Sequence, residues 1–243
     1  ANLLVDAHKM RDGHLDAVFM VAYLEQQGRD DESLKNATHK ADSILDAIRS
    51  MVGQTPDFAL AQTPEDLYRN KFNDTKSVVL GIENGYAIGK NLANIARYKA
   101  AGVAYMTLCH NGDNDICDSA KGNAEHGGLS TFGREVVAEM NRLGILIDMS
   151  HSAETSFYDA LELSKAPIVC SHSSARALCE HPRNLTDNQM RALAKKDGVA
   201  QITLYPGFLR NSGQATIIDA VDHLVHAAKI MGVEHVGLGT DFD

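Results

Sequence analysis

Two histidines, His151 and His172, occupy matching positions along the chain and are the first candidates for chemistry. Each comes at the end of a short apolar run, at 145–149 and 167–171, and a segment with helical spacing, 154–163, lies between the runs. An apolar run, a helix and a second apolar run form the pattern of a βαβ unit with parallel strands. Both imidazoles therefore belong just past the carboxyl ends of neighbouring strands, where α/β proteins bind ligands. One interpretation is a shared metal ion, and the other is two unrelated loop histidines.

The ends of the other expected strands also carry polar side chains. Taking the residue just past each apolar run adds Glu83, His110, Tyr205 and Asp241 to the two histidines. One carboxylate and two imidazoles suit Zn²⁺ or a similar ion with an open coordination position. A carboxylate can also bridge two ions about 3.5–4 Å apart, as in hydrolases that attack with a metal-bound hydroxide. In the alternative interpretation Glu83 caps the following helix, and His110 and Asp241 are ordinary loop residues.

Two further groups of polar residues have both a functional and a plain interpretation. Arg183, in the sequence HPR, could bind a substrate carboxylate through its guanidinium fork or could simply lie in solvent. Asp113, Asp115 and Asp118 resemble a calcium loop only superficially, because the rest of that pattern is absent, and we expect a solvated loop. No G-x-S-x-G nucleophile elbow is present, which favours a metal-activated water over a serine nucleophile.

Composition limits the classes of protein that could carry these residues. A chain of 243 residues, 44% of them hydrophobic, can bury a sizeable core. Its net charge of −9 argues against nucleic acid or an anionic membrane surface as a partner. No apolar run approaches the ~20 residues of a membrane span, so we expect a soluble protein, either cytoplasmic or exported. The 4 cysteines lack CxxC spacing and are interpreted as reduced.

Apolar runs alternate with helical segments along the whole chain, without repeats or a linker. We expect strands at 16–22, 77–82, 103–108, 145–149, 167–171, 199–204 and 235–239, and helices at 30–51, from 63, and at 90–101, 130–143, 154–163, 186–196 and 216–231. This order predicts an α/β protein built as a (β/α)₈ TIM-type barrel that lacks one strand and its final helical part. An open doubly wound sheet is the alternative, although its glycine-rich phosphate fingerprint is missing.

Five longer motifs follow one another along the chain: GIENG (81–85), TLCHN (107–111), GLSTFGREVVAEMNRLGILIDMSH (128–151), APIVCSHSSARALCEHPRNLTD (166–187) and GLGTDFD (237–243). In sequence and order they resemble the zinc-dependent membrane (renal) dipeptidases and their bacterial relatives. The resemblance implies a metallohydrolase barrel that cleaves dipeptides at a binuclear zinc site and often tolerates a D-residue at the carboxyl-terminal position.

For the metal, the resemblance makes Glu83 the bridging carboxylate, and His151 and His172 the ligands that complete the second zinc site. The family's first zinc takes two ligands from an H-x-D motif on the first strand. His14 and Asp16 spell this motif, but they precede an apolar run instead of following it. We therefore expect the H-x-D strand to be absent and His14 to lie at the surface. The chain is then one metallohydrolase barrel domain, 1–243, truncated at both ends, with one zinc site or two.

For the substrate, the resemblance implies that His110 binds near the scissile carbonyl and stabilises the tetrahedral intermediate. Arg183 would hold the substrate carboxylate, Asp241 would pass a proton to the leaving amine, and Tyr205 would at most line the site. A homodimer is also implied. The alternatives are a non-catalytic relative that binds a metal or a peptide, and a different amidohydrolase-type barrel acting on a ring amide.

Overall fold

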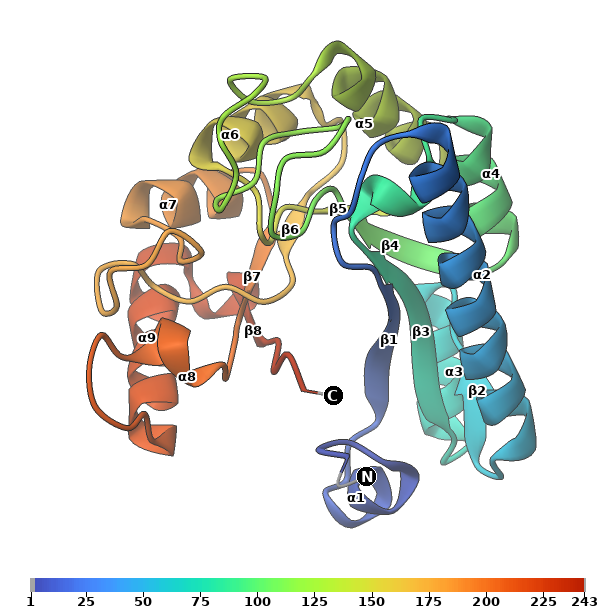
Figure 1. The fold of residues 1–243 in the computed structure, drawn as a ribbon. Helices are drawn as coiled ribbons and strands as arrows, with labels where there is room; N and C mark the ends of the chain where they lie inside the picture. Colours follow the sequence, from blue (N-terminus) through green and yellow to red (C-terminus); the bar gives the residue numbers. More distant parts are fainter. Residues whose placement is uncertain (1–2, 243) are drawn as a thin grey trace.

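A curled sheet of parallel strands forms the centre of the computed structural model, which describes residues 3–242 (Figure 1). Its strands follow one another in space in the order β1 (Ala17–Tyr23), β3 (Lys76–Glu83), β4 (Val103–Thr107), β5 (Leu146–Asp148), β6 (Val169–Cys170), β7 (Val199–Ile202) and β8 (Val236–Leu238). The short β2 (Phe58–Leu60) pairs with the first half of β3, beside the stretch of β3 that pairs with β4. Within residues 3–242, β1 and β8 are not paired with each other, so the curl stays open.

Helices lie around the outer side of this curl, apart from the one that precedes β1, which lies below that strand in the view (Figure 1). They are α1 (Ala7–Asp12), α2 (Asp31–Gln54), α3 (Pro64–Phe72), α4 (Ala93–Ala100), α5 (Thr131–Leu143), α6 (Glu154–Leu163), α7 (Asp187–Lys195), α8 (Pro206–Leu209) and α9 (Ile217–Met231), with 3₁₀ turns at Gly85–Ile88 and Val233–His235. The predicted TIM-type α/β architecture with an incomplete barrel is confirmed. Three short elements escaped prediction: α1, β2 and α8.

The elements form where the sequence supplies start and stop signals. Thr63 and Asp66 build a reciprocal capping box at the start of α3, with Pro64 in the first turn. Gly144 ends α5 in the left-handed conformation at φ 67°, which glycine adopts without a Cβ penalty. The middle of β3, from Ser77 to Ile82, is buried throughout, as expected for a parallel strand covered on both faces. These signals explain why α3 begins, and α5 ends, at the residues expected from the sequence.

The polar segment 111–128 is a folded loop that packs against α5. The expectation that its acidic residues lie in solvent is wrong for Asp118. Asp118 is fully buried and accepts hydrogen bonds from the backbone N–H groups of His126 (2.9 Å) and Gly128 (2.9 Å). Asp113 accepts in the same way from Ser119 (2.7 Å) and from another backbone N–H of the loop. These carboxylates therefore satisfy the loop's own backbone donors, which would otherwise be costly to bury.

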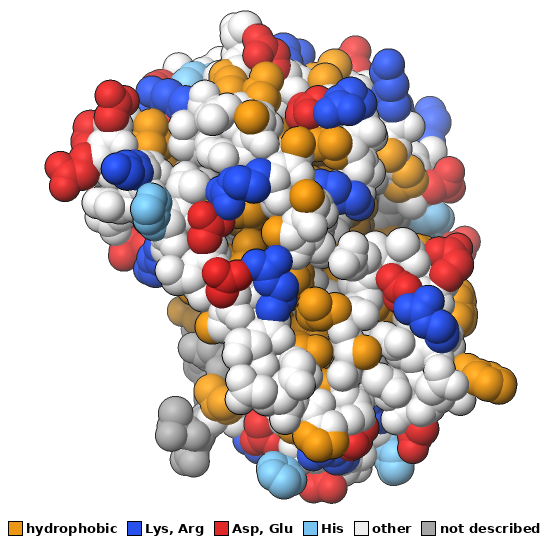
Figure 2. Space-filling view, turned by 90° about the vertical axis from the view of Figure 1, so that its right-hand side faces the viewer, with side chains coloured by type: hydrophobic (Ala, Val, Ile, Leu, Met, Phe, Trp, Pro, Cys, Tyr) orange, Lys and Arg blue, Asp and Glu red, His pale blue; other side chains and the backbone are white. Residues whose placement is uncertain are grey.

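The outer surface carries charges of both signs, intermixed. Figure 2 shows the side of α2, α3 and α4, where basic and acidic side chains alternate with apolar ones. Arg97 on α4 pairs there with Asp42 on α2 at 2.6 Å. Among the helices described, none is long and apolar enough to cross a membrane. The four cysteines are free, in agreement with their interpretation as reduced, and all four are buried.

Candidate metal centre

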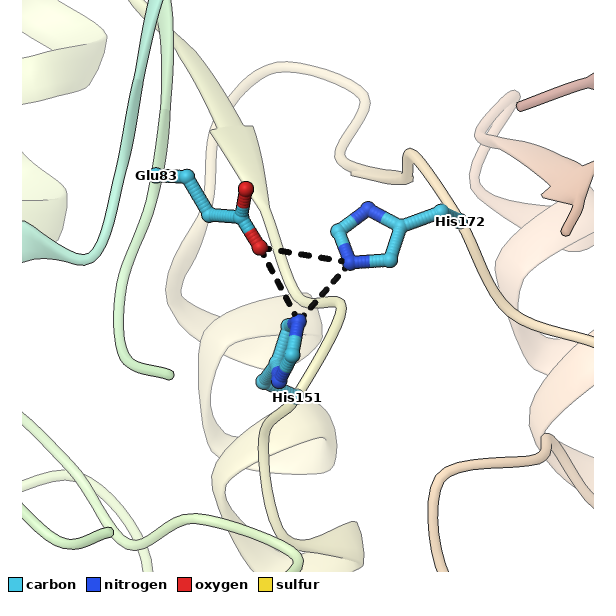
Figure 3. Close-up of side chains that lie close together, drawn as sticks. All are labelled: Glu83, His151 and His172. Carbon is cyan, nitrogen blue, oxygen red and sulfur yellow. Dashed lines mark hydrogen bonds and ion pairs between the residues drawn. The ribbon is translucent and has the colours of Figure 1, made fainter. Parts of the chain in front are cut away.

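Three potential metal ligands converge at the carboxyl ends of neighbouring strands. Glu83 is the last residue of β3, His151 lies just beyond β5, and His172 lies just beyond β6. The Oε1 atom of Glu83 is 3.1 Å from Nε2 of His151 and 3.5 Å from Nε2 of His172. The two Nε2 atoms are 2.8 Å apart, and all three side chains point at one another (Figure 3). The sequence-predicted ligand set is thus brought together from strands far apart in sequence.

The donor set and its dimensions suit a tetrahedral zinc ion. With bonds of about 2.0–2.1 Å, ligand atoms around tetrahedral zinc are roughly 3.3 Å apart. The three measured distances, 2.8, 3.1 and 3.5 Å, lie near that value. Three protein ligands leave a fourth position open, which is the arrangement of catalytic zinc sites.

The electrostatics of the three side chains also favour a cation. Burial and the nearby charge of Arg183 lower the pKa of His151 and of His172, so both rings are neutral and can offer a lone pair. Burial, together with the charges of Asp241 and Asp148, raises the pKa of Glu83 to about 8. The charged form of Glu83 is therefore costly in this site, and a bound metal ion would stabilise it.

The loop 111–128 holds His151. The backbone of His151 is left-handed, with φ 71°, and its carbonyl accepts hydrogen bonds from the Ala120 N–H at 2.8 Å and the Ser119 hydroxyl at 3.2 Å. Asn111 Oδ1 lies 3.2 Å from Nδ1 of His151. An amide oxygen can only accept, so Nδ1 carries the hydrogen and Nε2 is free to bind a metal. The loop that showed no regular pattern in the sequence therefore positions a ligand.

His110, at the end of β4, lies beside these ligands. Its Nε2 is 3.9 Å from Glu83 Oε1, and its ring is 4.2 Å from the ring of His151 and 4.9 Å from that of Tyr23. Burial and the charge of Arg183 lower the pKa of His110 to about 4, so the ring is neutral at pH 7. Its buried Nδ1 has no hydrogen-bond partner among the described residues.

Arg183 lies almost completely buried next to His172. Only 3% of the residue is exposed, its Nη2 donates to the His172 carbonyl at 3.2 Å, and its guanidinium lies 5.4 Å over the ring of Phe208. Burial lowers the pKa of Arg183, but an arginine stays charged at any ordinary pH. Its buried Nε has no partner in the described part of the chain, so one donor is available to a ligand.

Asp241 and Tyr205 stand at the rim. Asp241 is exposed, follows β8 and has a left-handed backbone with φ 62°. Its charge contributes to the raised pKa of Glu83, which places it within electrostatic range of the ligands. Tyr205 is 53% exposed and stacks on Phe208 at 4.7 Å, so it reaches the centre only through the Phe208 ring that also contacts Arg183.

His14 and Asp16 lie away from the centre. Both precede β1, whereas Tyr23 at the other end of that strand contacts His110. His14 is exposed, and Asp16 forms ion pairs with Lys71 and, at 3.8 Å, with a second lysine. This placement agrees with the expectation that the pair is not the family's H-x-D motif.

One buried group near the centre was missed in the sequence. Asp148 ends β5 and is fully buried, with Thr107, Ser150 and Ser171 as hydrogen-bond partners. The available signal was its position inside the apolar run 145–149, because a carboxylate in a buried strand must be hydrogen-bonded or charge-paired.

The comparisons with known proteins agree with this geometry. Residues 1–243 match the family model of the membrane dipeptidases, peptidase family M19, and the chain belongs to this family. It is 36% identical to the uncharacterized dipeptidase C965.12 of Schizosaccharomyces pombe, over 98% of this chain and 60% of that protein. It is 33% identical to dipeptidase 3 of Mus musculus, over 97% of this chain and 47% of that protein. The chain thus spans about half to three fifths of the length of these curated relatives.

Solved structures show the same fold. The probable dipeptidase PvdM from Pseudomonas aeruginosa superposes with a TM-score of 0.95 at 23% identity, covering 100% of this chain and 78% of that one. An amidohydrolase from Pseudomonas aeruginosa gives a TM-score of 0.86 at 27% identity, covering 97% of this chain and 69% of that one. A metallopeptidase from Rhodobacter sphaeroides, solved with a phosphinate mimic of L-Ala-D-Ala, gives 0.90 at 24% identity, covering 100% and 78%.

Proposed function

We propose that this protein is a zinc-dependent dipeptidase that hydrolyses the peptide bond of dipeptides. The observation that carries the proposal is the convergence of Glu83, His151 and His172 at one point, with Arg183 and His110 beside them. Membership of the membrane dipeptidase family supports this substrate class. We further propose that residues 1–243 act as one barrel domain and that the protein is a homodimer.

In this proposal the metal is held by the carboxylate of Glu83 and the Nε2 atoms of His151 and His172. When bound, a zinc ion supplies the activation of water, whose pKa it lowers towards ~7. The surrounding protein keeps both imidazoles neutral through burial, so no proton has to leave them before the metal binds.

The substrate is bound and polarised by the neighbouring side chains. His110 is neutral, and an N–H on its Nε2 can donate to the carbonyl oxygen as negative charge develops there. Arg183 offers its unpartnered Nε and its positive charge to the substrate carboxylate, which fixes the dipeptide's carboxyl end. Asp241, at the exposed rim, would act as the acid/base that takes a proton from the attacking water and passes it to the leaving amine.

A D-residue at the carboxyl-terminal position is part of the proposal. The Rhodobacter sphaeroides metallopeptidase with the same fold was solved with a mimic of L-Ala-D-Ala. We expect this protein to hydrolyse L-Ala-D-Ala as well as L-Ala-L-Ala.

The decisive experiment is zinc content and hydrolysis of the 243-residue chain after chelation and reloading. We expect about one zinc per chain, because one three-ligand cluster is found among residues 3–242, and hydrolysis of L-Ala-D-Ala that chelation abolishes and zinc restores. Zinc binding without hydrolysis would instead favour a non-catalytic relative. Cleavage of a cyclic amide but of neither dipeptide would favour another amidohydrolase. Sedimentation of the same sample tests the homodimer.

A further inference from the structure

We propose that Asp148 and Ser171 are positioning residues that hold His172 in the tautomer with its hydrogen on Nδ1 and its lone pair on Nε2. The inference rests on the proposed function, since it assigns these residues a role towards the metal ligand. It concerns side chains that lie behind the ligand, away from Glu83.

The carboxylate of Asp148 accepts four hydrogen bonds, two at each oxygen. Oδ1 accepts the backbone N–H groups of Ser150 at 3.0 Å and Ser171 at 2.8 Å. Oδ2 accepts the hydroxyls of Thr107 and of Ser171, both at 2.6 Å. A buried carboxylate with four donors is fully satisfied in its ionised form, and an ionised carboxylate can only accept. Both hydroxyl protons therefore point at Asp148.

The single hydroxyl proton of Ser171 decides the tautomer of His172. The Ser171 oxygen also lies 2.8 Å from Nδ1 of His172. Since its proton is engaged with Asp148, this oxygen must accept at that contact, and Nδ1 must carry the hydrogen. The other neighbour that could take the serine proton, the hydroxyl of Ser150, is 3.4 Å away, too far to compete with a charged acceptor at 2.6 Å.

The same cluster also fixes where the imidazole points. The backbone N–H of His172 donates to the Ser150 hydroxyl at 2.9 Å, just beyond β5, and the His172 ring contacts Ser171, which is itself bound to Asp148 at the end of β5. The ring then presents Nε2 to Glu83 Oε1 and to Nε2 of His151. Partners of this kind behind a ligating histidine typically contribute 10–100-fold to metal affinity.

Asp148 could instead have a purely structural role, in which it holds together the ends of β4, β5 and β6. Two matched variants distinguish this role from the proposed one. Ser171→Ala and Thr107→Val each remove one hydroxyl that donates to Asp148 Oδ2 at 2.6 Å. Only the first also contacts His172. A structural role predicts similar effects of both, whereas the proposed role predicts an effect on the ring for Ser171→Ala alone.

The experiment is ¹⁵N NMR of the metal-free chain with labelled histidine, near pH 7. We expect His172 to carry its hydrogen on Nδ1 in the unmodified protein, in Thr107→Val and in Ser171→Thr, which keeps the hydroxyl. In Ser171→Ala we expect a mixture of the two tautomers. Hydrogen on Nε2 in the unmodified protein, or equal spectra for Ser171→Ala and Thr107→Val, would overturn the inference.

Zinc affinity, measured by competition with a chromophoric chelator, gives a second readout. We expect a loss of about 10–100-fold for Ser171→Ala and less than a threefold change for Thr107→Val. Equal losses in the two variants would contradict the inference. The tautomer of His172 is measured without metal, so the two proposals can fail separately. If His172 keeps its hydrogen on Nδ1 but the chain binds no zinc, the proposed function is wrong and this inference still holds.

Discussion

Glu83 places an ionisable carboxyl group in a buried position, where its charged form is costly. Burial, the main cause, and the charges of Asp241 and Asp148 raise its pKa to about 8, while Arg183 opposes this rise. Below pH 8 the metal-free carboxyl therefore keeps its proton. The proton must leave before the oxygen can bind a metal, so metal and proton compete for this side chain.

We predict that zinc affinity rises about tenfold per pH unit from pH 6 to 8 and levels off above pH 8. The histidine ligands contribute little to this slope, because burial lowers their pKa and they are already neutral. Isothermal titration calorimetry in two buffers of different ionisation enthalpy should detect about one proton released per zinc at pH 6.5. An affinity independent of pH across this range would contradict the combination of a raised pKa and a ligand role at Glu83.

His172 and His14 allow a comparison between a residue in the centre and one outside it. Replacing His172 by alanine removes one of the three donors, so we expect zinc content and hydrolysis to be lost together. His14→Ala alters an exposed side chain before β1 and should change neither. Zinc per chain by elemental analysis, with circular dichroism as the folding control, makes the comparison. Loss of zinc in His14→Ala would mean that the first strand has been assigned wrongly and that His14 is a metal ligand.

The convergence of the three candidate ligands could be predicted from the sequence, whereas the hydrogen-bond partners behind them could not. Parallel strands bring their carboxyl ends to one edge, so Glu83, His151 and His172 had to lie near one another once the strands were recognised. Ser171 and Asn111 act through hydrogen bonds whose partners depend on side-chain rotamers and loop paths. The periodicity of a sequence does not reveal side-chain rotamers or loop paths.

Among the elements, α5 illustrates how one backbone position ends a helix. Gly144 adopts φ 67°, and the nearest atom to an added Cβ is the Lys99 Nζ at 4.0 Å, so an alanine there would fit sterically. Its cost comes from the left-handed backbone alone, about 1–2 kcal/mol. We predict that Gly144→Ala lowers the free energy of unfolding by this amount in urea titrations.

Gly53 is the matched control, since it lies within α2 with open space around it. Gly53→Ala should stabilise the protein by up to about 1 kcal/mol, because alanine favours the helix and restricts the unfolded chain. A stabilising Gly144→Ala would mean that α5 ends differently from the structure.

The elements that sequence missed are those too short to show a period. Phe58–Leu60 has three residues, fewer than the run needed to recognise alternation, and it becomes a strand because the edge of β3 lies beside it. The helix α8 starts with Pro206 and Gly207, residue types that are common in turns, yet they begin a single helical turn whose Phe208 and Leu209 are buried. Packing against the rest of the fold decides whether such short segments become strands or helical turns.

At the scale of the whole molecule, the ion should act as a link between strands. In the proposed site a zinc ion would join the ends of β3, β5 and β6, so its binding energy would add to the stability of the folded state. We predict that zinc at a hundred times its Kd stabilises the chain by about 2.7 kcal/mol, which raises Tm by roughly 5–11 °C.

Differential scanning fluorimetry with and without a chelator measures this shift. The variant His172→Ala serves as the control and should show no zinc-dependent change. A shift of equal size in that variant would indicate that zinc binds elsewhere on the fold.

The order of the strands has a consequence for how the protein is made. From β3 to β8 each strand pairs with the one synthesised just before it, so the sheet can grow as the chain leaves the ribosome. Glu83, at the end of β3, emerges before His172, which follows β6. The strands before β6 must therefore fold without help from the metal, and a nascent chain can complete the proposed zinc site only after His172 has emerged.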